Sequence, residues 1–447
     1  MNLIPLLGHT SLDDIFAFCP SGTVRVRDFL ADVEALAAIL PAGRHQLNVC
    51  QDRYRFTVGL AAGLLSGKTS LQPASQSSET LRQIKTACPD VYCLCDSNFD
   101  NLDLPRLDFP EVVSVNTEKV AKIPTIPADF EAVQLFTSGS TGTPVAHVKT
   151  WGLLVLNGRA EAQRLGLLEQ PHSIIGTVPA QHSYGFESTV LLALHGNSPF
   201  WSGKPFYPQD IVSALNAVPP PRLLVSTPFH LSALIAAGLD LPAIDMLLSA
   251  TAPLSQQLAN AAETCCKAPL FEIYGSTESG QLASRRTTAD LAWELLPGVR
   301  LEQADEQTIA CGGHVEGHVP LSDVIEILPD GRFLLHGRHA DLINIPGKRT
   351  SLAYLNHQIA AIPGVIDAAF FLPDSEAVDG ITRLCAFVVA PGMNSRQLLA
   401  ELRPRIDSIF LPRPLVLLDQ LPRNATGKLP RNHLQVLFAE KVAHVER

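Results

Sequence analysis

The sequence predicts an α/β protein, with a large multi-layer N-terminal domain of packed β-sheets and helices and a small α+β C-terminal domain. Three observations favour this fold class. The chain has 447 residues, more than one domain of roughly 100–200 residues needs. Helix-like and strand-like segments alternate along it, and 46 % of its residues are hydrophobic. The pattern restarts after a hairpin that ends near residue 337, so we expect domains at 1–337 and 338–447.

Periodicity and short apolar runs place the elements of the larger domain. Helical spacing of apolar residues predicts helices at 27–40, 55–65, 78–87 and 228–237. Apolar runs bounded by loop residues predict buried strands at 91–95, 223–228 and 246–250. This alternation is typical of stacked α/β layers.

A hairpin closes the larger domain, and a second α/β pattern follows it. Strands at 324–328 and 333–336 flank the turn Pro329-Asp330-Gly331-Arg332. After the hairpin we expect a helix at 351–362, strands at 366–372 and 384–389, and a helix at 395–406. These elements predict a small domain of about 110 residues.

Charge and cysteine content narrow the class of protein. The net charge is −10, which argues against a nucleic-acid partner. It is uneven: residues 338–447 carry 13 Lys/Arg against 10 Asp/Glu (+3), and the remainder 21 against 34 (−13). No apolar run approaches the ~20 residues of a membrane span, and the start resembles no signal peptide. The nine cysteines have neither zinc nor redox spacing, so we expect reduced thiols and a cytoplasmic location.

The strongest local signal is the segment from Leu135 to Pro144. A short apolar strand runs into a loop with two glycines and five hydroxyl residues. Such a loop presents backbone N–H groups and hydroxyls together, and its glycines let a phosphate approach closely. It is not a Walker A loop, because no Gly-Lys-Ser/Thr follows. Taken alone, the cluster is equally compatible with an ordinary loop.

Further motifs follow this loop in a fixed order. They are Pro179-Ala180-Gln181-His182-Ser183-Tyr184-Gly185, Ser249-Ala250-Thr251-Ala252-Pro253-Leu254, Ile273-Tyr274-Gly275-Ser276-Thr277-Glu278, Asp323, Gly337-Arg338-His339-Ala340-Asp341, Gly347-Lys348-Arg349 and Pro422-Arg423-Asn424-Ala425-Thr426-Gly427-Lys428. Together the motifs resemble those of the adenylate-forming superfamily of acyl- and aryl-CoA synthetases, luciferases and peptide-synthetase adenylation domains. The matches run in order from residue 137 to residue 428, which is far more specific than any one motif.

The resemblance implies an ATP- and Mg²⁺-dependent acid–thiol ligase. A carboxylic acid is converted to its acyl-adenylate with release of pyrophosphate, and the acyl group then passes to a thiol of an acyl carrier protein or of CoA. No nucleic acid and no membrane span are expected. Two domains and a hinge suit this chemistry, because one site must present two different faces to the same adenylate.

The resemblance also assigns roles to residues. Lys428 would bridge the acid's carboxylate and the α-phosphate, Thr277 would bond the α-phosphate, and Glu278 would hold Mg²⁺ through oxygen. The ATP-binding set is Thr137, Ser138, Gly139, Ser140, Thr141, Gly142, Ser249, Ala250, Thr251, Tyr274, Gly275, Asp323 and Arg338. The acid-binding set is His182, Tyr184, Gly185, Phe186, Glu187, Gly280 and Gln281. Gly347 would let the thiol arm pass close to the backbone.

Each of these residues also has a plain structural explanation. Lys428 would otherwise be a solvated loop lysine, and Glu278 a carboxylate at the start of a helix. Asp323 would be an ordinary turn residue. Tyr274 would pack in the core in place of covering adenine, and His182 would be merely packed.

Several positions depart from the family pattern and suggest a divergent branch. The residue after the loop's proline is Val145 where lysine is common, and Lys149 is a candidate to supply that charge. Ala340 replaces the usual hinge aspartate, with Asp341 beside it; Leu321 and Ser322 precede Asp323 where Thr-Gly-Asp is usual, and Asn344 replaces a common lysine.

Two stretches, 144–151 and 341–352, are similar to the AMP-ligases of aryl polyene and xanthomonadin-type pigment clusters. Those enzymes load a hydroxybenzoate-like starter onto an acyl carrier protein, so the resemblance implies an aryl acid and pigment biosynthesis. A basic face on the small domain would suit an acidic carrier; its candidate residues are Arg403, Arg405, Arg413, Arg423 and Arg431. The alternatives are an acyl- or aryl-CoA ligase, a non-catalytic acyl or nucleotide binder, and a phosphoryl-transfer NTPase. The missing Walker lysine disfavours the last.

Overall fold

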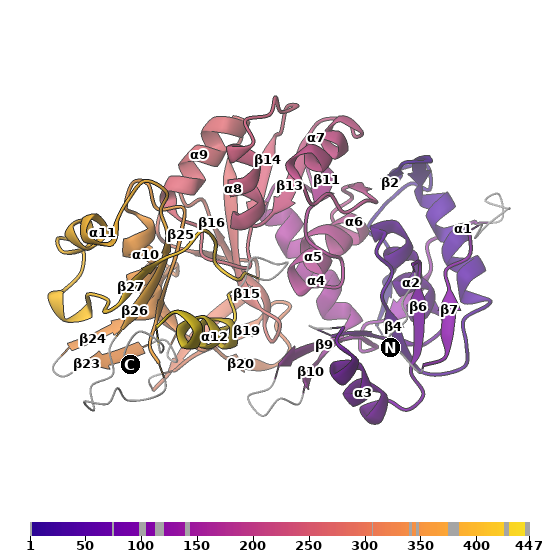
Figure 1. Ribbon diagram of the computed structural model, residues 1–447. Coiled ribbons are helices and arrows are strands. Elements are labelled where there is room, and N and C mark those ends of the chain that lie inside the picture. Colours follow the sequence, from indigo (N-terminus) through magenta and orange to yellow (C-terminus); the bar gives the residue numbers. More distant parts are fainter. Residues whose placement is uncertain are drawn as a thin grey trace.

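The computed structural model describes residues 2–73, 76–97, 104–111, 120–138, 144–305, 307–338, 342–345, 348–373, 384–423 and 429–442. Mixed α/β layers form a large N-terminal part, and a smaller C-terminal part follows it (Figure 1). The predicted fold class is therefore confirmed. Among the described residues, no helix has both the length and the apolar character needed to cross a membrane.

A nine-stranded sheet is the centre of the N-terminal part. Its order is β17-β16-β15-β14-β13-β11-β12-β2-β3. The bounds are β2 Ile15–Cys19, β3 Gly22–Arg25, β11 Ser173–Gly176, β12 Phe200–Trp201, β13 Arg222–Ser226, β14 Met246–Ser249, β15 Leu270–Ser276, β16 Gly280–Arg285 and β17 Glu294–Leu295. The strands from β2 to β15 in this order are parallel. At one edge β3 pairs antiparallel with β2, and at the other β16 pairs antiparallel with both β15 and β17. Such parallel strands are buried on both faces and therefore continuously apolar.

A six-stranded sheet lies beside it, in the order β10-β9-β5-β4-β6-β7. Its strands are β4 His45–Asn48, β5 Thr69–Gln72, β6 Tyr92–Cys95, β7 Arg106–Asp108, β9 Glu131–Ser138 and β10 Pro144–Thr150. The hairpin β9–β10 pairs Thr137 with Val145 and flanks the glycine-rich loop. The short pair β1 Leu3–Pro5 and β8 Thr125–Pro127 stands apart.

Helices fill the space around these sheets. They are α1 Val26–Ala37, α2 Arg53–Leu65, α3 Ser78–Ala87, α4 Trp151–Arg164, α5 Ser183–Gly185, the π-helix η2 Phe186–Leu191, α6 Leu192–His195, α7 Pro208–Asn216, α8 Pro228–Ala236 and α9 Gln256–Cys266. One apolar cluster includes residues of both sheets and of α1, α2, α4 and η2. The helices therefore join the two sheets through a shared core.

The side chain of Arg53 links several elements that surround this core. It is fully buried, and its guanidinium donates to the Thr189 hydroxyl and to the carbonyl oxygens of Trp201, Gly203, Gly176 and Val178. A buried charge is tolerated when its donors are satisfied. Arg53 thus connects the start of α2 with strands β11 and β12 and with η2.

Smaller sheets lead into the C-terminal part. They are β18 Val299–Ala304, β19 Gln307–Gly312 and β20 His318–Pro320; β21 Asp323–Ile327 with β22 Phe333–Arg338; β23 Leu342–Ile345 with β24 Lys348–Ser351; and β25 Asp367–Phe371, β26 Cys385–Val389 and β27 Leu415–Leu417. The C-terminal helices are α10 Leu352–Ala360, α11 Ser395–Leu402, the 3₁₀ turn η4 Ser408–Phe410 and α12 Arg431–Lys441. Alternate residues of β25 and β26 face two apolar clusters, one with α10 and α11 and one with α12.

The elements expected from sequence are present. The helix at 78–87 has the predicted bounds, and the hairpin of β21 and β22 surrounds the predicted turn. The expectation of a helix over 395–406 is wrong at its end: α11 stops at Leu402. Pro404 explains the stop, because proline has no backbone N–H to continue the hydrogen bonds of the helix.

Candidate functional site

Two of the predicted motifs meet at one edge of the nine-stranded sheet. Strands β14 and β15 are parallel neighbours, and their carboxyl ends lead into the segments 249–251 and 275–278. Ligands of open α/β sheets commonly bind outside such ends. Thr251 has φ of +78°, an unusual conformation for a β-branched residue. Strain of this kind is frequent at functional sites.

Tyr274 and Asp323 are joined directly. The Tyr274 hydroxyl donates to Oδ2 of Asp323 over 2.7 Å, and its ring packs against Trp293 and Phe333 with centroid distances of 5.6 Å each. The ring thus packs on two aromatic neighbours, and its role at adenine stays a prediction. Asp323 faces Arg338 across the β21–β22 ladder, so two members of the predicted ATP-binding set are neighbours.

Glu278 lies in a tight turn between β15 and β16. Ser276 and Ser279 close this turn: each side-chain hydroxyl accepts from the other's backbone N–H over 3.2 Å. The alternative that Glu278 starts a helix is therefore wrong. Its side chain is 42 % exposed, and Oε1 is 3.8 Å from Nε2 of His147.

His147 connects this turn with the strand that enters the glycine-rich loop. Its Nε2 is 2.9 Å from the Thr137 hydroxyl, so Thr137, His147 and Glu278 lie in one cluster. Burial lowers the pKa of His147, against the nearby charge of Glu278, which raises it. Sequence reasoning missed this histidine. The available signal was its position on β10, two residues from Lys149 and on the same face.

Lys149 points into the protein and is only 5 % exposed. Its ammonium donates to the backbone carbonyl of Glu278 over 2.6 Å, so it braces the turn that carries this carboxylate. Burial lowers the pKa of Lys149, and the charges of Glu187, Glu316 and Glu278 oppose that shift. Whether Lys149 also replaces the missing loop lysine stays a prediction, because residues 139–143 lie outside the described part of the chain.

The predicted acid-binding segment forms α5 and the start of η2. His182 caps α5: its Nδ1 accepts the Tyr184 backbone N–H over 3.3 Å. A Cβ on Gly185 would lie 2.0 Å from the Pro179 carbonyl oxygen, so only glycine fits there. Tyr184 and Phe186 are buried in the main apolar cluster. Glu187 is buried too, and burial raises its pKa to about 8, while the charge of Lys149 acts to lower it.

Comparison with known proteins identifies the family. The model of the AMP-binding enzyme family matches residues 34–318, and that of the AMP-binding enzyme C-terminal domain matches residues 356–428. The chain belongs to the AMP-binding enzyme family. It is an AMP-forming acid–thiol ligase that uses ATP.

Individual relatives agree with this assignment. The chain is 30 % identical over 273 residues to a 4-coumarate–CoA ligase of Rhodobacter capsulatus, covering 61 % of this chain and 67 % of the relative. It is 26 % identical over 347 residues to a 4-chlorobenzoate–CoA ligase of an Arthrobacter species, covering 68 % and 65 %. The solved o-succinylbenzoate coenzyme A synthetase of Bacillus subtilis, in complex with ATP and magnesium, has a TM-score of 0.81 at 19 % identity, covering 97 % of this chain and 100 % of that one. This likeness concerns the fold.

The residues of this AMP-binding enzyme suit ATP and Mg²⁺ chemically. The partly exposed Glu278 offers the hard oxygen ligands that Mg²⁺ prefers. Thr137 is linked to Glu278 through His147, and Thr277 precedes Glu278 in the turn. Ser249, at the end of β14, has a fully buried hydroxyl without a hydrogen-bond partner among the described residues.

Several predicted site residues cannot be placed. Lys428, Gly347 and Gly139 to Gly142 lie outside the described residues, as do the side chains of Ser138 and Arg338. The predictions for these residues stand as predictions.

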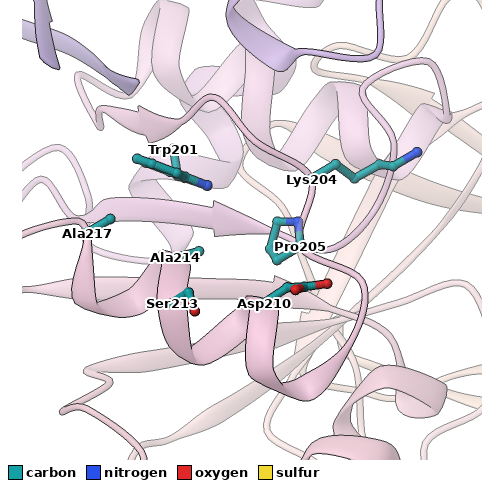
Figure 2. Close-up of a pocket in the computed structure, with 7 residues that line it drawn as sticks. All are labelled: Trp201, Lys204, Pro205, Asp210, Ser213, Ala214 and Ala217. Carbon is teal, nitrogen blue, oxygen red and sulfur yellow. The ribbon is translucent and has the colours of Figure 1, made fainter. Parts of the chain in front are cut away.

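Two surface pockets of the enzyme lie away from these clusters. One, of about 410 Å³, is lined by Trp201, Lys204, Pro205, Asp210, Ser213, Ala214 and Ala217 (Figure 2). The other, of about 390 Å³, lies between α9 and α10 and is lined by Ser255, Gln256, Gln257, Asn260, His357 and Ala361. Neither includes a predicted site residue, so the motifs and not these hollows define the site.

Proposed function

We propose that this enzyme activates a small aryl acid, such as a hydroxybenzoate, and passes the acyl group to the phosphopantetheine thiol of an acyl carrier protein. The observation that carries the nucleotide part is the gathering of Thr137, Glu278, Tyr274 and Asp323 around the ends of β9, β15 and the start of β21. The relatives named above act on 4-coumarate and 4-chlorobenzoate, two aryl acids, which supports the choice of acid.

The reaction has two steps. A carboxylate oxygen of the acid attacks the α-phosphorus of ATP, the bond to the bridging oxygen breaks, and pyrophosphate leaves. The thiol sulfur then attacks the acyl carbon of the adenylate, its proton is lost, and AMP leaves. Bringing two anions together requires cations and aimed dipoles, which is the role proposed for Lys428.

The proposed roles of the other residues follow from their positions. Asp323 would accept the ribose hydroxyls, held in place by Tyr274. Glu278 would hold Mg²⁺, which when bound neutralises charge on the phosphates. Lys149 holds the backbone of that turn through its hydrogen bond to the Glu278 carbonyl. Thr277 and the loop from Thr137 to Gly142 would contact the phosphates.

The two-step reaction also motivates the proposed domain division at 1–337 and 338–447. Both apolar clusters of the C-terminal part contain only residues from 343 onward. A unit with its own core can turn as a body between the two steps. We place Arg338 at the hinge and Gly347 beside the thiol arm.

Positive charge on the C-terminal part supports a carrier protein as the acceptor of the acyl group. Of the five arginines expected to form a basic face, Arg423 makes a bidentate ion pair with Asp367 at 2.7 and 2.8 Å, and Arg431 lies over the ring of Phe371. The charge of Arg423 is thus largely compensated. Arg403 and Arg413 are exposed, and Arg405 is half-buried. These three supply the face that we propose steers an acidic carrier protein.

CoA is the second candidate acceptor, because the relatives named above are CoA ligases. The resemblance of residues 144–151 and 341–352 to the AMP-ligases of pigment clusters supports a role in pigment biosynthesis. All nine cysteines are free, which supports a reducing compartment such as the cytoplasm.

Product analysis tests the proposal. A panel of benzoates, cinnamates and fatty acids is incubated with ATP and Mg²⁺, once with CoA and once with a holo-carrier protein. AMP and pyrophosphate formation that depends on an aryl acid is expected, with faster thioester formation on the carrier. ADP and phosphate as products, or fatty acids as the better substrates, contradict the activity or the acid. Faster transfer to CoA contradicts the acceptor alone.

A further inference from the structure

A chain of buried hydrogen bonds runs from α4 to β16 behind the predicted acid-binding residues. The Ser188 hydroxyl donates to Oε1 of Glu161 over 2.7 Å, and Nε2 of Gln281 donates to the Ser188 oxygen over 2.8 Å. All three side chains are at most 2 % exposed. The directions of these bonds fix the amide of Gln281, because the Ser188 proton is already used on Glu161.

The members of this group leave acceptor atoms without donors. Oε1 of Gln281 and Oδ1 of Asn157 are buried and have no hydrogen-bond partner among the described residues. Nδ1 of His314 is likewise buried and has no hydrogen-bond partner among the described residues. Its Nε2 donates to the Gln281 carbonyl, and burial lowers the pKa of His314 to about 4, so the ring is neutral and Nδ1 is an acceptor.

These residues converge on Gly280. A Cβ built on Gly280 would lie 3.3 Å from Nδ2 of Asn157, 3.5 Å from Oε1 of Glu187 and 3.5 Å from Cδ2 of His314. Asn157 and Glu161 are four residues apart and share one face of α4. Helix α4, strand β16 and the segment of His314 thus bring around Gly280 three residues that each carry an unpaired acceptor, Asn157, Gln281 and His314. That place adjoins Glu187 and Gln281, two residues of the predicted acid-binding set.

Unpaired buried acceptors of this kind need an explanation, since most buried polar atoms in proteins are paired. A group that supplies only donors would satisfy them. A carboxylate, ether or halogen on the substrate would not, because it would add further acceptors. An ordered water that bridges the acceptors is the competing explanation.

We infer that Gln281, Asn157 and His314 form a subsite that selects acids bearing a hydrogen-bond donor, a hydroxyl or an amino group, away from the carboxylate. The inference rests on the proposed function, because it takes the acid to lie beside η2 and β16. It goes further by naming the substituent and the residues that recognise it. Asn157 and His314 are specificity residues that no sequence motif indicates.

A substrate series tests the subsite. Pyrophosphate release is measured for hydroxy-, amino-, methoxy- and methyl-benzoates at each ring position. A site built around hydrogen bonds rejects an analogue that lacks the donor by large factors. We expect kcat/KM for the best hydroxy- or amino-acid to exceed that of its methoxy and methyl counterparts by about 100-fold or more.

Two variants connect this preference to the named residues. Gln281→Met and Asn157→Leu remove the acceptors with little change in volume, and each is expected to reduce the preference ratio at least about tenfold. The ratio is taken within one variant, so a smaller folded fraction cancels. Gln46→Met is the matched control: Gln46 is also a buried glutamine with both amide atoms unpaired among the described residues, but it lies on β4. The control should leave the ratio unchanged.

The outcomes separate the two claims. If aryl acids release pyrophosphate but methoxy and hydroxy acids react equally, a buried water satisfies the acceptors and the subsite is disproved while the proposed function stands. The same conclusion follows if Gln281→Met and Asn157→Leu keep the wild-type ratio. If no acid of the series releases pyrophosphate with the wild-type enzyme, the proposed aryl activity fails first.

Discussion

The hydroxyl of Tyr274 donates to Oδ2 of Asp323 over 2.7 Å, and this bond joins the end of β15 to the start of β21. Asp323 in turn faces Arg338, the last residue of β22. The proposed ribose carboxylate is therefore held between the nucleotide motif of the large sheet and the strand that leads to the small domain. Its position depends on a residue 49 positions earlier in the chain.

Replacement of Tyr274 by phenylalanine tests this support. The ring keeps its contacts with Trp293 and Phe333, and the hydrogen bond to Asp323 is lost. One such bond contributes about 0.5–1.5 kcal/mol, so the KM for ATP should rise about 2- to 12-fold with a smaller effect on kcat. Tyr354→Phe is the control, because it also removes one tyrosine hydrogen bond, but that bond goes to the Arg405 carbonyl and not to Asp323. An unchanged KM in Tyr274→Phe means that the bond does not support nucleotide binding.

Glu278→Gln tests the metal assignment. The change keeps the size of the side chain and removes its charge, so we expect kcat/KM to fall by about 100-fold or more and the Mg²⁺ concentration for half-maximal rate to rise. Pyrophosphate release measured across a Mg²⁺ titration checks both effects. Glu169→Gln, at an exposed glutamate, is the control. Wild-type rates at low Mg²⁺ in Glu278→Gln would make Glu278 a structural residue.

Lys428→Ala tests the lysine proposed to act where charge develops. Such a group contributes to rate more than to ground-state binding. We expect loss of pyrophosphate exchange, with the Kd for ATP within several-fold of wild type. Lys441→Ala, at the end of α12, is the matched control. Normal exchange in Lys428→Ala would refute the role.

Local order was largely predictable from the sequence. The strand-then-loop motifs at 135–144 and 273–278 need only short-range patterns, and the structure has strands there as expected. The same holds for the helix at 78–87, which Ser77 caps through its hydroxyl. Motif order was also enough to identify the superfamily.

Partnerships between distant residues were not predictable. Periodicity indicates which side chains face inward, but it does not say what they meet. Gln281 bonds Ser188, 93 positions away, and Arg423 pairs with Asp367, 56 positions away. The first contact creates the polar group behind the acid-binding residues, and the second removes an arginine from the expected basic face. The sequence offered Lys149 as a candidate loop cation but gave no sign of its hydrogen bond to the Glu278 carbonyl, 129 positions away.

The carrier-protein prediction rests on exposed charge. Arg403→Glu with Arg413→Glu should raise the KM for holo-carrier protein about 10-fold or more at low salt and less at high salt, because screening weakens the steering. The adenylation half-reaction should not change. Arg82→Glu, at an exposed position of α3, is the control. Equal KM values in the double variant and the wild type would contradict carrier recognition by this face.

The buried ring of His195 should make the stability of the folded protein depend on pH. This side chain is 2 % exposed, its ring packs edge-on against Trp151, and neither ring nitrogen has a hydrogen-bond partner among the described residues. Burial, aided by the charges of Arg159 and His9, lowers its pKa from 6.5 to about 3. The folded state therefore leaves His195 unprotonated at pH values where the unfolded chain takes up a proton.

This difference in proton binding sets the direction in which stability changes with pH. Between pH 6.5 and about 3 the unfolded state binds more protons at this position, so the free energy of unfolding falls as the pH falls, by up to about 1.4 kcal/mol per pH unit. Above pH 6.5 His195 contributes no slope. Glu161 and Glu187 act in the opposite direction, because burial raises their pKa values to about 7 and about 8. The total slope is thus a balance, and a variant is needed to isolate His195.

His195→Gln removes the titrating group and keeps a polar side chain of similar size. Urea unfolding at several pH values from 7.5 to 4.5 should give a stability curve whose fall below pH 6.5 is shallower than that of the wild type by about 1 kcal/mol per pH unit. His357→Gln, at an exposed histidine of α10, should keep the wild-type slope. The comparison uses slopes, so an overall loss of stability in His195→Gln does not affect it. Parallel curves for His195→Gln and wild type would show that His195 is protonated in the folded protein as readily as in the unfolded chain.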